Sequence, residues 1–287
     1  MKKFAGLNEK YSNYETAKIA VLPVPYDKTS TWIKGADDGP EALLEASEAL
    51  EWFDIETKTE VYRHGIATLP EVDDDSTPEK LCAAVDDAVS QILSDEKFPV
   101  IIGGNHTVSI GSFRAMARHF GNLTILQLDA HSDIRDTYEG SPLNHACVMY
   151  QAASLAQVTQ VGIRSMCIEE LHHINHDRIF YAHEIFDNNL WQQRALDTLS
   201  QNVYVTIDLD VLDPSVLPST GTPEPGGLTY YQVLHFLRSV FVNRNVVGFD
   251  IVELCPNSKQ KASDFLAARL AYQLMTYKFF YGAGKNQ

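Results

Sequence analysis

Two apolar runs that end in charged residues decide the fold of this chain: Leu123-Thr-Ile-Leu-Gln-Leu-Asp-Ala-His131 and Val203-Tyr-Val-Thr-Ile-Asp-Leu-Asp-Val-Leu212. Their apolar, often β-branched residues are typical of strands that are buried on both faces of a sheet. Six other stretches have the length and composition of strands, at residues 18–26, 61–69, 98–104, 158–165, 179–185 and 246–254. Because amphipathic segments lie between these runs, the pattern predicts βαβ units and a mostly parallel sheet sandwiched between helices.

Four amphipathic segments are predicted to be helices. Pro40 and Pro78 suit a first helical turn, and Thr77 is a suitable N-cap for the helix that follows it. The predicted helices span residues 41–53, 78–93, 107–120 and 263–280. The sequence shows no repeat, low-complexity tract or long Gly/Ser linker, so residues 1–287 are expected to form a single domain.

The composition restricts the classes of partner. With 23 basic and 38 acidic residues the net charge is −15, whereas nucleic acids and anionic membranes favour a basic surface. The four cysteines are scattered and form no CxxC pair, as in proteins of a reducing compartment. Neither a signal-peptide core nor a window of about 20 apolar residues is present. We therefore expect a cytoplasmic protein that binds neither nucleic acid nor membrane.

Closely spaced ionisable residues follow four of the strand-like runs, in GGNHT (103–107), DAHSD (129–133), DLDVLD (208–213) and DIVEL (250–254). In open α/β sheets, ligands bind at the carboxyl ends of the strands. Residues i, i+2 and i+4 of an extended segment share one face, so Asp129, His131 and Asp133 would crowd into one small volume. Asp208 and Asp210 would do the same on a second strand.

Such crowding indicates a metal site. Neighbouring carboxylates either take up protons or need a cation, and four carboxylates balance two divalent ions. Oxygen and nitrogen ligands without thiolate suit Mn²⁺, or Mg²⁺, Fe²⁺, Co²⁺ or Ni²⁺, rather than structural zinc. A single aspartate at a strand end is usually a cap or turn residue, and a single histidine is usually an ordinary neutral side chain. The spacing in two segments, with His106 in a third, favours a binuclear metal centre instead.

Three of these segments resemble the signature motifs of the ureohydrolase family, which comprises arginases, agmatinases and related guanidino hydrolases. They are Gly103-Gly-Asn-His-Thr107, Asp129-Ala-His-Ser-Asp133 and Thr206-Ile-Asp-Leu-Asp-Val-Leu-Asp-Pro214, and the loop Thr220–Gly227 is also similar. The resemblance implies a three-layer α/β/α arginase-like fold with a mostly parallel eight-stranded sheet. It also implies two Mn²⁺ ions, with Ni²⁺, Co²⁺ or Fe²⁺ as alternatives, and a homotrimer or homohexamer.

Carried over position by position, the resemblance implies a role for each candidate site residue. Asp129 and Asp208 would bridge the two metal ions, and His106 and Asp133 would complete the coordination of one of them. The full set of implied metal ligands is His106, Asp129, His131, Asp133, Asp208 and Asp210.

Two further residues match catalytic positions of the family, and with the ligand Asp133 they make up the predicted catalytic set. His145, in SPLNHACV, falls at the proton-shuttle histidine, and Glu253, in GFDIVEL, falls at the acid that grips the substrate guanidinium. A guanidinium carbon is a poor electrophile, but two metal ions can lower the pKa of a shared water enough to supply hydroxide. A histidine can protonate the leaving amine, and a carboxylate can orient the guanidinium.

The loop Asp133–His145 bears on the substrate. It lacks the Asn- and Ser-rich run of arginases and resembles the D-x-R-x-x-Y-E-G-x-P-L-x-H loop of bacterial agmatinases. The resemblance therefore implies a small cationic guanidino substrate, with hydrolysis of agmatine to putrescine and urea, a step of polyamine biosynthesis, as the expected reaction.

Three departures from the family pattern leave other substrates open. Asn105 stands where the family usually has an acid, residues 34–41 lack the arginines of agmatinases, and residues 255–265 match neither branch. An arginase and a hydrolase of aminopropylagmatine, a guanidino acid or formimidoylglutamate remain alternatives. A non-catalytic binding homologue and a single-zinc deacetylase of similar fold are more distant ones, and the number of metal ions per chain would separate them.

Overall fold

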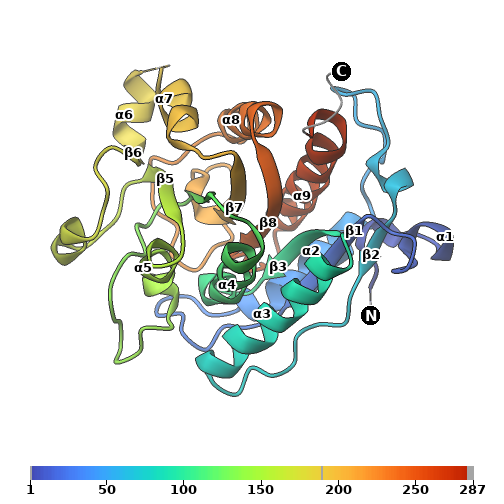
Figure 1. The fold of residues 1–287 in the computed structure, drawn as a ribbon, viewed down its shortest axis with the longest axis horizontal. Coiled ribbons are helices and arrows are strands. Elements are labelled where there is room, and N and C mark those ends of the chain that lie inside the picture. The colour runs from blue at the N-terminus through green and yellow to red at the C-terminus, as the bar shows by residue number, and fades with distance from the viewer. Residues whose placement is uncertain (1, 189, 283–287) are drawn as a thin grey trace.

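Eight parallel strands form one sheet in the computed structural model, which describes residues 2–188 and 190–282 (Figure 1). The order of the strands across the sheet is β2-β1-β3-β8-β7-β4-β5-β6. Their bounds are β1 (Ile19–Val24), β2 (Ile66–Thr68), β3 (Phe98–Gly103), β4 (Leu123–Leu128), β5 (Gln157–Ile163), β6 (Ile179–Tyr181), β7 (Asn202–Asp208) and β8 (Asn245–Val252). The predicted α/β fold with a parallel eight-stranded sheet is confirmed, and each strand lies within a predicted run or overlaps it.

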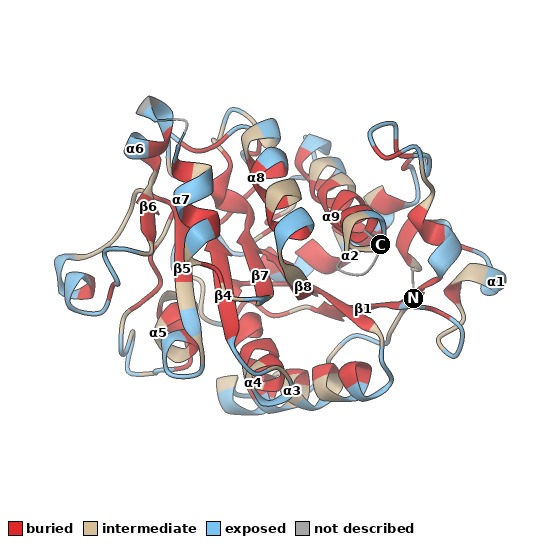
Figure 2. Cartoon of the chain, turned by 45° about the horizontal axis from the view of Figure 1, so that its top comes forward, coloured by how far each residue is buried: buried red, intermediate tan, exposed pale blue. Residues whose placement is uncertain are grey.

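Helices cover both faces of this sheet. They are α1 (Glu9–Ser12), α2 (Gly39–Ser47), α3 (Pro78–Ser94), α4 (Ser109–His119), α5 (Val148–Ala153), α6 (Ala182–Asp187), α7 (Trp191–Thr198), α8 (Tyr230–Asn243) and α9 (Ala262–Tyr281). Figure 2 shows α2, α7, α8 and α9 on one face and α3, α4 and α5 on the other. Among the described residues, no helix is long and apolar enough to cross a membrane.

Two hydrophobic cores lie between the three layers. Successive side chains of a strand point to opposite faces, so Val203 and Val205 belong to one core and Tyr204 to the other. The strands are therefore apolar on both faces, which explains why they appear in the sequence as continuous runs rather than as alternating patterns.

Several predicted boundaries were wrong. The helix predicted to reach residue 53 ends at Ser47, whose hydroxyl donates to the carbonyl of Leu44 and accepts from the amide of Ala5. The run at 61–69 contains only the short strand β2, because the chain turns at Gly65 with a φ of 80°. Helix α8 was not predicted, although Thr229 forms a capping box with Gln232 at its start.

The sheet order determines where the polar segments lie. The four runs that end in ionisable residues are β3, β8, β7 and β4, and these four strands are adjacent in the centre of the sheet. Parallel strands present their carboxyl ends at the same edge. The four polar segments therefore converge at one place, although the first begins at residue 103 and the last at residue 250.

Gly104 follows β3 at the point where three chain segments meet. Its amide donates to the carbonyl of Val24, and its carbonyl accepts from the amide of Glu253. A Cβ atom at this position would overlap the backbone of Tyr26, which cannot move away as a flexible side chain could.

We therefore expect Gly104→Ala to lower the free energy of unfolding by about 1–3 kcal/mol or more, because overpacking against backbone forces it to shift. Urea denaturation measures this change. Gly121→Ala is the matched control, since no atom lies within 4 Å of a Cβ there. Equal stability of the two variants would contradict the expected close packing.

Candidate metal centre and active site

The structure brings all six predicted metal ligands together at the carboxyl edge of the central strands. His106 begins a short 3-10 turn after β3, Asp129 follows β4, and Asp208 is the last residue of β7. Asp210 lies in the 3-10 turn that directly follows. All four of these side chains are buried.

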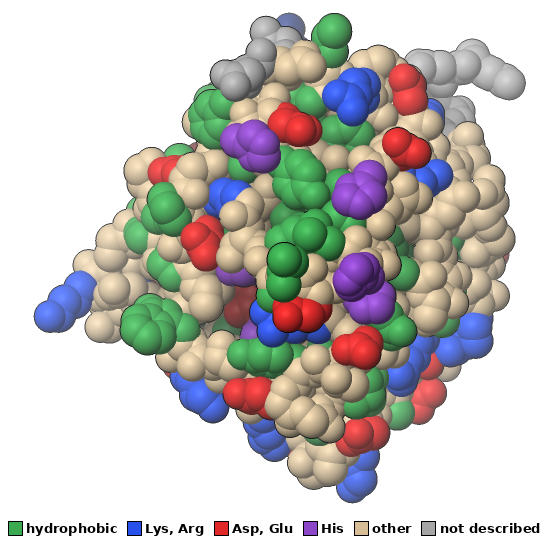
Figure 3. Space-filling view, turned by 90° about the vertical axis from the view of Figure 1, so that its left-hand side faces the viewer, with side chains coloured by type: hydrophobic (Ala, Val, Ile, Leu, Met, Phe, Trp, Pro, Cys, Tyr) green, Lys and Arg blue, Asp and Glu red, His purple; other side chains and the backbone are tan. Residues whose placement is uncertain are grey.

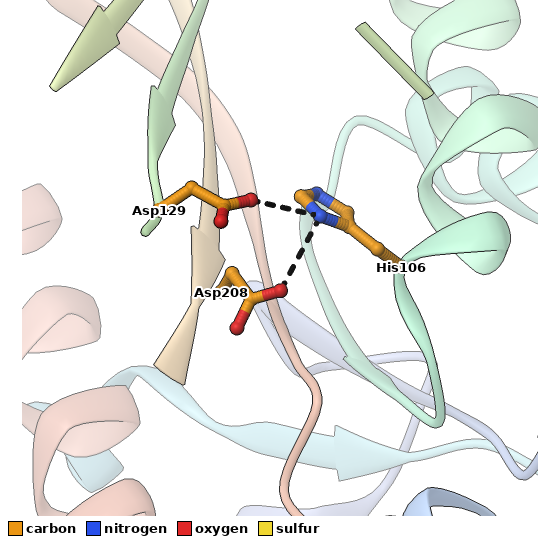
Figure 4. Close-up of side chains that lie close together, drawn as sticks. All are labelled: His106, Asp129 and Asp208. Carbon is orange, nitrogen blue, oxygen red and sulfur yellow. Dashed lines mark ion pairs between the residues drawn. The ribbon is translucent and has the colours of Figure 1, made fainter. Parts of the chain in front are cut away.

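One group of ligands surrounds the ring of His106. Its Nδ1 atom lies 3.2 Å from a carboxylate oxygen of Asp129, 3.2 Å from one of Asp133 and 3.5 Å from one of Asp208. Figure 4 shows the carboxylates of Asp129 and Asp208 pointing toward this ring from two neighbouring strands. The ligand atoms of His106, Asp129 and Asp208 lie close enough together to hold one metal ion.

A second group surrounds His131, whose Nδ1 lies 2.8 Å from a carboxylate oxygen of Asp210 and 3.6 Å from one of Asp129. These three residues could also hold a metal ion. Asp129 belongs to both groups, through its two different carboxylate oxygens. The arrangement therefore offers two adjacent cation sites that share Asp129.

The hydrogen bonds of His106 reveal which ring nitrogen faces the ligands. Its Nε2 lies 2.9 Å from the hydroxyl of Thr206, and that hydroxyl donates to Asp250 at 2.6 Å. Thr206 must then accept the proton of Nε2, which leaves a lone pair on Nδ1. Nδ1 is buried and has no hydrogen-bond partner among the described residues. This lone pair faces three carboxylates, so it can bind a proton in the metal-free protein or a divalent metal ion in its place.

The pKa values of the clustered side chains also indicate a site that binds cations. Burial and the negative charges of Asp210 and Asp129 raise the pKa of Asp208 well above its usual value. Burial and Asp129 raise the pKa of Asp133 to about 6. Burial acts to lower the pKa of His131, but Asp210 and Asp129 outweigh it and raise that pKa. Without a metal the cluster therefore retains protons at neutral pH, and divalent cations would replace them.

The two remaining predicted residues lie in the same cavity, which has a volume of about 290 Å³ and is also lined by Asp133 and Asp208. The amide of His106 donates to the carboxylate of Glu253 at 2.7 Å, and burial raises the pKa of Glu253 to about 8. Nδ1 of His145 is buried without a hydrogen-bond partner among the described residues. Burial, and then the charges of two neighbouring histidines, lowers the pKa of His145 to about 4.

Two of the candidate residues have a left-handed backbone. The φ angle is 48° at Asp133 and 64° at Glu253, and few residues other than glycine adopt such values without strain. Glu253 directly follows β8 and Asp133 lies in the loop after β4, where the chain turns and both side chains line the cavity. Strain of this kind is concentrated at functional sites.

Sequence reasoning missed the residues that hold the ligands in place. Gln127 donates to Asp129 at 2.7 Å, and Gln160 donates to Gln127 at 2.6 Å. Thr206 and Asp250 support His106 in the same way, as described above. A signal was present, because Gln127 and Thr206 are polar interruptions of buried strands, each two positions before a ligand. Alternate residues of a strand share a face, so these side chains point toward the ligand cluster.

Asn105, the departure from the family pattern, is fully buried beside the ligands. Its side-chain oxygen accepts from the amide of Thr107 at 3.2 Å. Its side-chain amide donates to the hydroxyls of Thr29 at 2.7 Å and Ser30 at 3.3 Å. Asn105 therefore links the turn that carries His106 to the loop at residues 29–33, part of which lines the cavity.

Comparison with known proteins agrees with this geometry. The Arginase family model matches residues 17–277. N(1)-aminopropylagmatine ureohydrolase of Synechocystis sp. is 41% identical over 281 residues, which cover 94% of this chain and 92% of that protein. Agmatinase of Halalkalibacterium halodurans is 34% identical over 255 residues, which cover 85% of this chain and 86% of that protein.

Among solved structures, agmatine ureohydrolase of Thermoplasma volcanium superposes with a TM-score of 0.88 at 30% identity. The superposition covers 98% of this chain and 95% of that one. The family model, the relatives and the solved structure all extend over most of the chain, and the range of the family model, 17–277, includes every segment of the candidate site. The chain is a member of the arginase family of ureohydrolases.

Proposed function

We propose that this protein is a binuclear-metal ureohydrolase that releases urea from a guanidine bearing one or more amines. N(1)-aminopropylagmatine is the first candidate substrate and agmatine the second. One observation carries the proposal. Two groups of side chains could each hold a metal ion and share Asp129, and they lie in the same site as Glu253 and His145. A non-catalytic homologue would not need all of these groups together.

The six ligands would hold two divalent cations, for which we propose Mn²⁺ because the donors are carboxylate oxygens and imidazole nitrogens. Asp129 would bridge the two ions, and Asp208 is proposed as the second bridge. When bound, the ions would lower the pKa of a shared water and so make a nucleophile available at neutral pH. Ni²⁺, Co²⁺ and Fe²⁺ are the alternatives.

The remaining groups act on the substrate. Glu253 would accept N–H bonds from the guanidinium and hold its carbon over the metal centre. Burial favours the neutral form of this carboxyl group, so a cationic substrate that pairs with its ionised form would displace a proton when it binds at pH 7. The pKa of about 4 keeps the ring of His145 neutral at pH 7, so it would first accept a proton within the site and then pass it to the departing amine.

The choice of substrate depends on the relatives and on the charge of the cavity. The loop Asp133–His145 favours agmatine, whereas the identity to N(1)-aminopropylagmatine ureohydrolase, 41%, exceeds the 34% to an agmatinase. The cavity is acidic, and the one arginine among its described lining residues, Arg135, lies 3.8 Å from Glu170 and over the ring of Tyr138. Both amines suit this environment better than the carboxylate of arginine does.

Several wider properties follow as part of the same proposal. The products would be spermidine or putrescine, which places the reaction in polyamine biosynthesis. We propose a single cytoplasmic domain that assembles as a homotrimer or homohexamer. Figure 3 supports assembly, because hydrophobic side chains gather on the face that carries β6, α6 and α7. Phe186 in α6 and Leu190, which directly precedes α7, are both exposed.

Urea release from a panel of guanidines tests the proposed function. The panel comprises N(1)-aminopropylagmatine, agmatine, arginine and guanidinobutyrate, each with Mn²⁺, Ni²⁺ or Co²⁺. We expect the highest kcat/KM for an amine-bearing guanidine. Highest activity on arginine or on a guanidino acid would overturn the choice of substrate, and no urea from any of the four would overturn the function.

Metal binding is expected to release protons at pH 7. Raised carboxyl and histidine pKa values mean that the metal-free cluster holds protons there, and Mn²⁺ must displace them. Isothermal titration calorimetry in two buffers of different ionisation enthalpy measures the number released. Asp208→Asn should release fewer protons, and the exposed Asp136→Asn should match the parent protein. Identical heats in both buffers would contradict the proposed protonation.

His145→Ala should lower kcat by about 10²–10⁴ and leave both metal ions bound, since proton transfer contributes that much and His145 is not a proposed ligand. Steady-state kinetics and metal analysis of the same preparation test the two parts. A lost metal ion would make His145 a ligand rather than a proton carrier, and an unchanged kcat would remove it from the mechanism.

A further inference from the structure

Trp32 lies at the rim of the cavity, on the loop Thr29–Ile33, which we call the rim loop. We propose that the face of its indole ring binds the remote ammonium group of the substrate and so selects guanidines that carry an amine. This inference rests on the proposed function and deepens it, because it names the group that recognises the far end of the substrate.

The exposure of Trp32 is unusual for its position. Trp32 is 75% exposed, yet it lines the same cavity as His145 and Glu253. Among the residues that the structure describes, none stacks on this ring or accepts a hydrogen bond from it. Single exposed apolar residues are common on protein surfaces. An exposed indole at the mouth of an acidic cavity is instead placed to bind a ligand.

The rim loop is held at both ends. Asn105 donates to Thr29 and Ser30, and the hydroxyl of Thr29 lies 2.9 Å from that of Thr107. Beyond the loop, the carboxylate of Asp27 accepts from the amides of Gly35 and Ala36 at 2.6 and 3.2 Å. These bonds reduce the freedom of the segment between them, so Trp32 is presented at a defined place rather than on a loose loop.

The rim loop also lies close to Glu253, the residue proposed to bind the substrate guanidinium. The amide of Ile33 donates to the carbonyl of Gly221 at 3.4 Å. A Cβ atom on Gly221 would lie 3.1 Å from the carbonyl oxygen of Ile33 and 3.7 Å from a carboxylate oxygen of Glu253. The backbone of Gly221 thus lies between the rim loop and the carboxylate of Glu253 and is close to both. A substrate held by Glu253 would extend along this loop toward the rim.

The chemistry of the rim fits an ammonium group. A cation over an indole face is attracted by the negative potential of the ring, and Trp binds cations better than Tyr or Phe does. The buried carboxylates of the cavity are occupied: Glu170 accepts from Ser132 at 2.6 Å and from the amide of Cys167 at 2.6 Å. Asp133 and Asp208 belong to the proposed metal site. Tyr138 also lines the cavity, but the guanidinium of Arg135 already lies over its ring. Among the described lining residues, Trp32 therefore offers an indole face that no protein cation occupies.

The test compares the metal-loaded parent protein with Trp32→Leu, which keeps apolar bulk without a π face, and Trp32→Phe, which restores a π face. We expect Trp32→Leu to lower kcat/KM for N(1)-aminopropylagmatine and agmatine about tenfold, mainly through KM, and Trp32→Phe to recover most of the loss. Butylguanidine has the carbon chain of agmatine without the amine. Its inhibition constant should rise by less than about threefold in Trp32→Leu.

Binding of the product amine gives a readout that does not depend on urea release. Calorimetry should show weaker binding of spermidine to Trp32→Leu than to the parent protein or to Trp32→Phe. If no guanidine releases urea, the proposed function fails while this binding still tests the role of Trp32. Equal losses for butylguanidine and the amines, or no loss for either, would overturn the inference. An altered oligomeric state of Trp32→Leu would overturn it too, by making the rim a subunit contact.

Discussion

The crowding of four aspartates into one buried volume is the constraint on which the rest of this structure depends. Three carboxylates lie within 3.5 Å of a single ring nitrogen of His106, and a fourth lies 2.8 Å from His131. Water cannot solvate these groups at such burial, so protons or cations must neutralise them. The parallel sheet creates this situation, because it brings the carboxyl ends of its central strands to one edge. The same arrangement that costs folding free energy without a metal provides the binding free energy for one.

The surrounding structure holds the ligands in the orientation that a metal needs. Thr206 and Asp250 fix the tautomer of His106, and Gln127 with Gln160 holds Asp129. These are buried polar groups within the hydrophobic layers, and each is satisfied by a hydrogen bond. Their bonds also limit the movement of the ligand side chains. A ligand set that is already in place loses less entropy when it binds a metal.

Asn105 connects this centre to substrate recognition. An amide at this position adds no further negative charge next to His106. It donates to Thr29 and Ser30, whereas a carboxylate would have to accept from these two hydroxyls. Asn105 therefore fixes the start of the rim loop that carries Trp32. A change in substrate preference within a family can arise in this way, from one buried residue that positions a loop while the metal ligands stay the same.

Local sequence was sufficient for the strands and for the candidate ligands. Strands buried on both faces are continuous apolar runs, and the close spacing of Asp129, His131 and Asp133 marked them as candidate ligands. The predicted reason was wrong, because β4 ends at Leu128 and Asp133 has a left-handed backbone, so a turn after the strand, not one strand face, brings these side chains together. Helix and strand ends were less predictable. Ser47 ends α2 through contacts with residues 44 and 5, and the second of these is distant in the sequence.

The order of the strands was not readable from the residues, because it depends on how the connections pack and not on the strands themselves. That order places β3, β8, β7 and β4 side by side, and so it assembles the four polar segments into one site. The supports of the ligands and the place of Trp32 depend on it as well. Residue types and spacing thus determined the chemistry that this protein can perform. Tertiary packing decided which groups meet, since distances between segments far apart in the sequence are set by the whole fold.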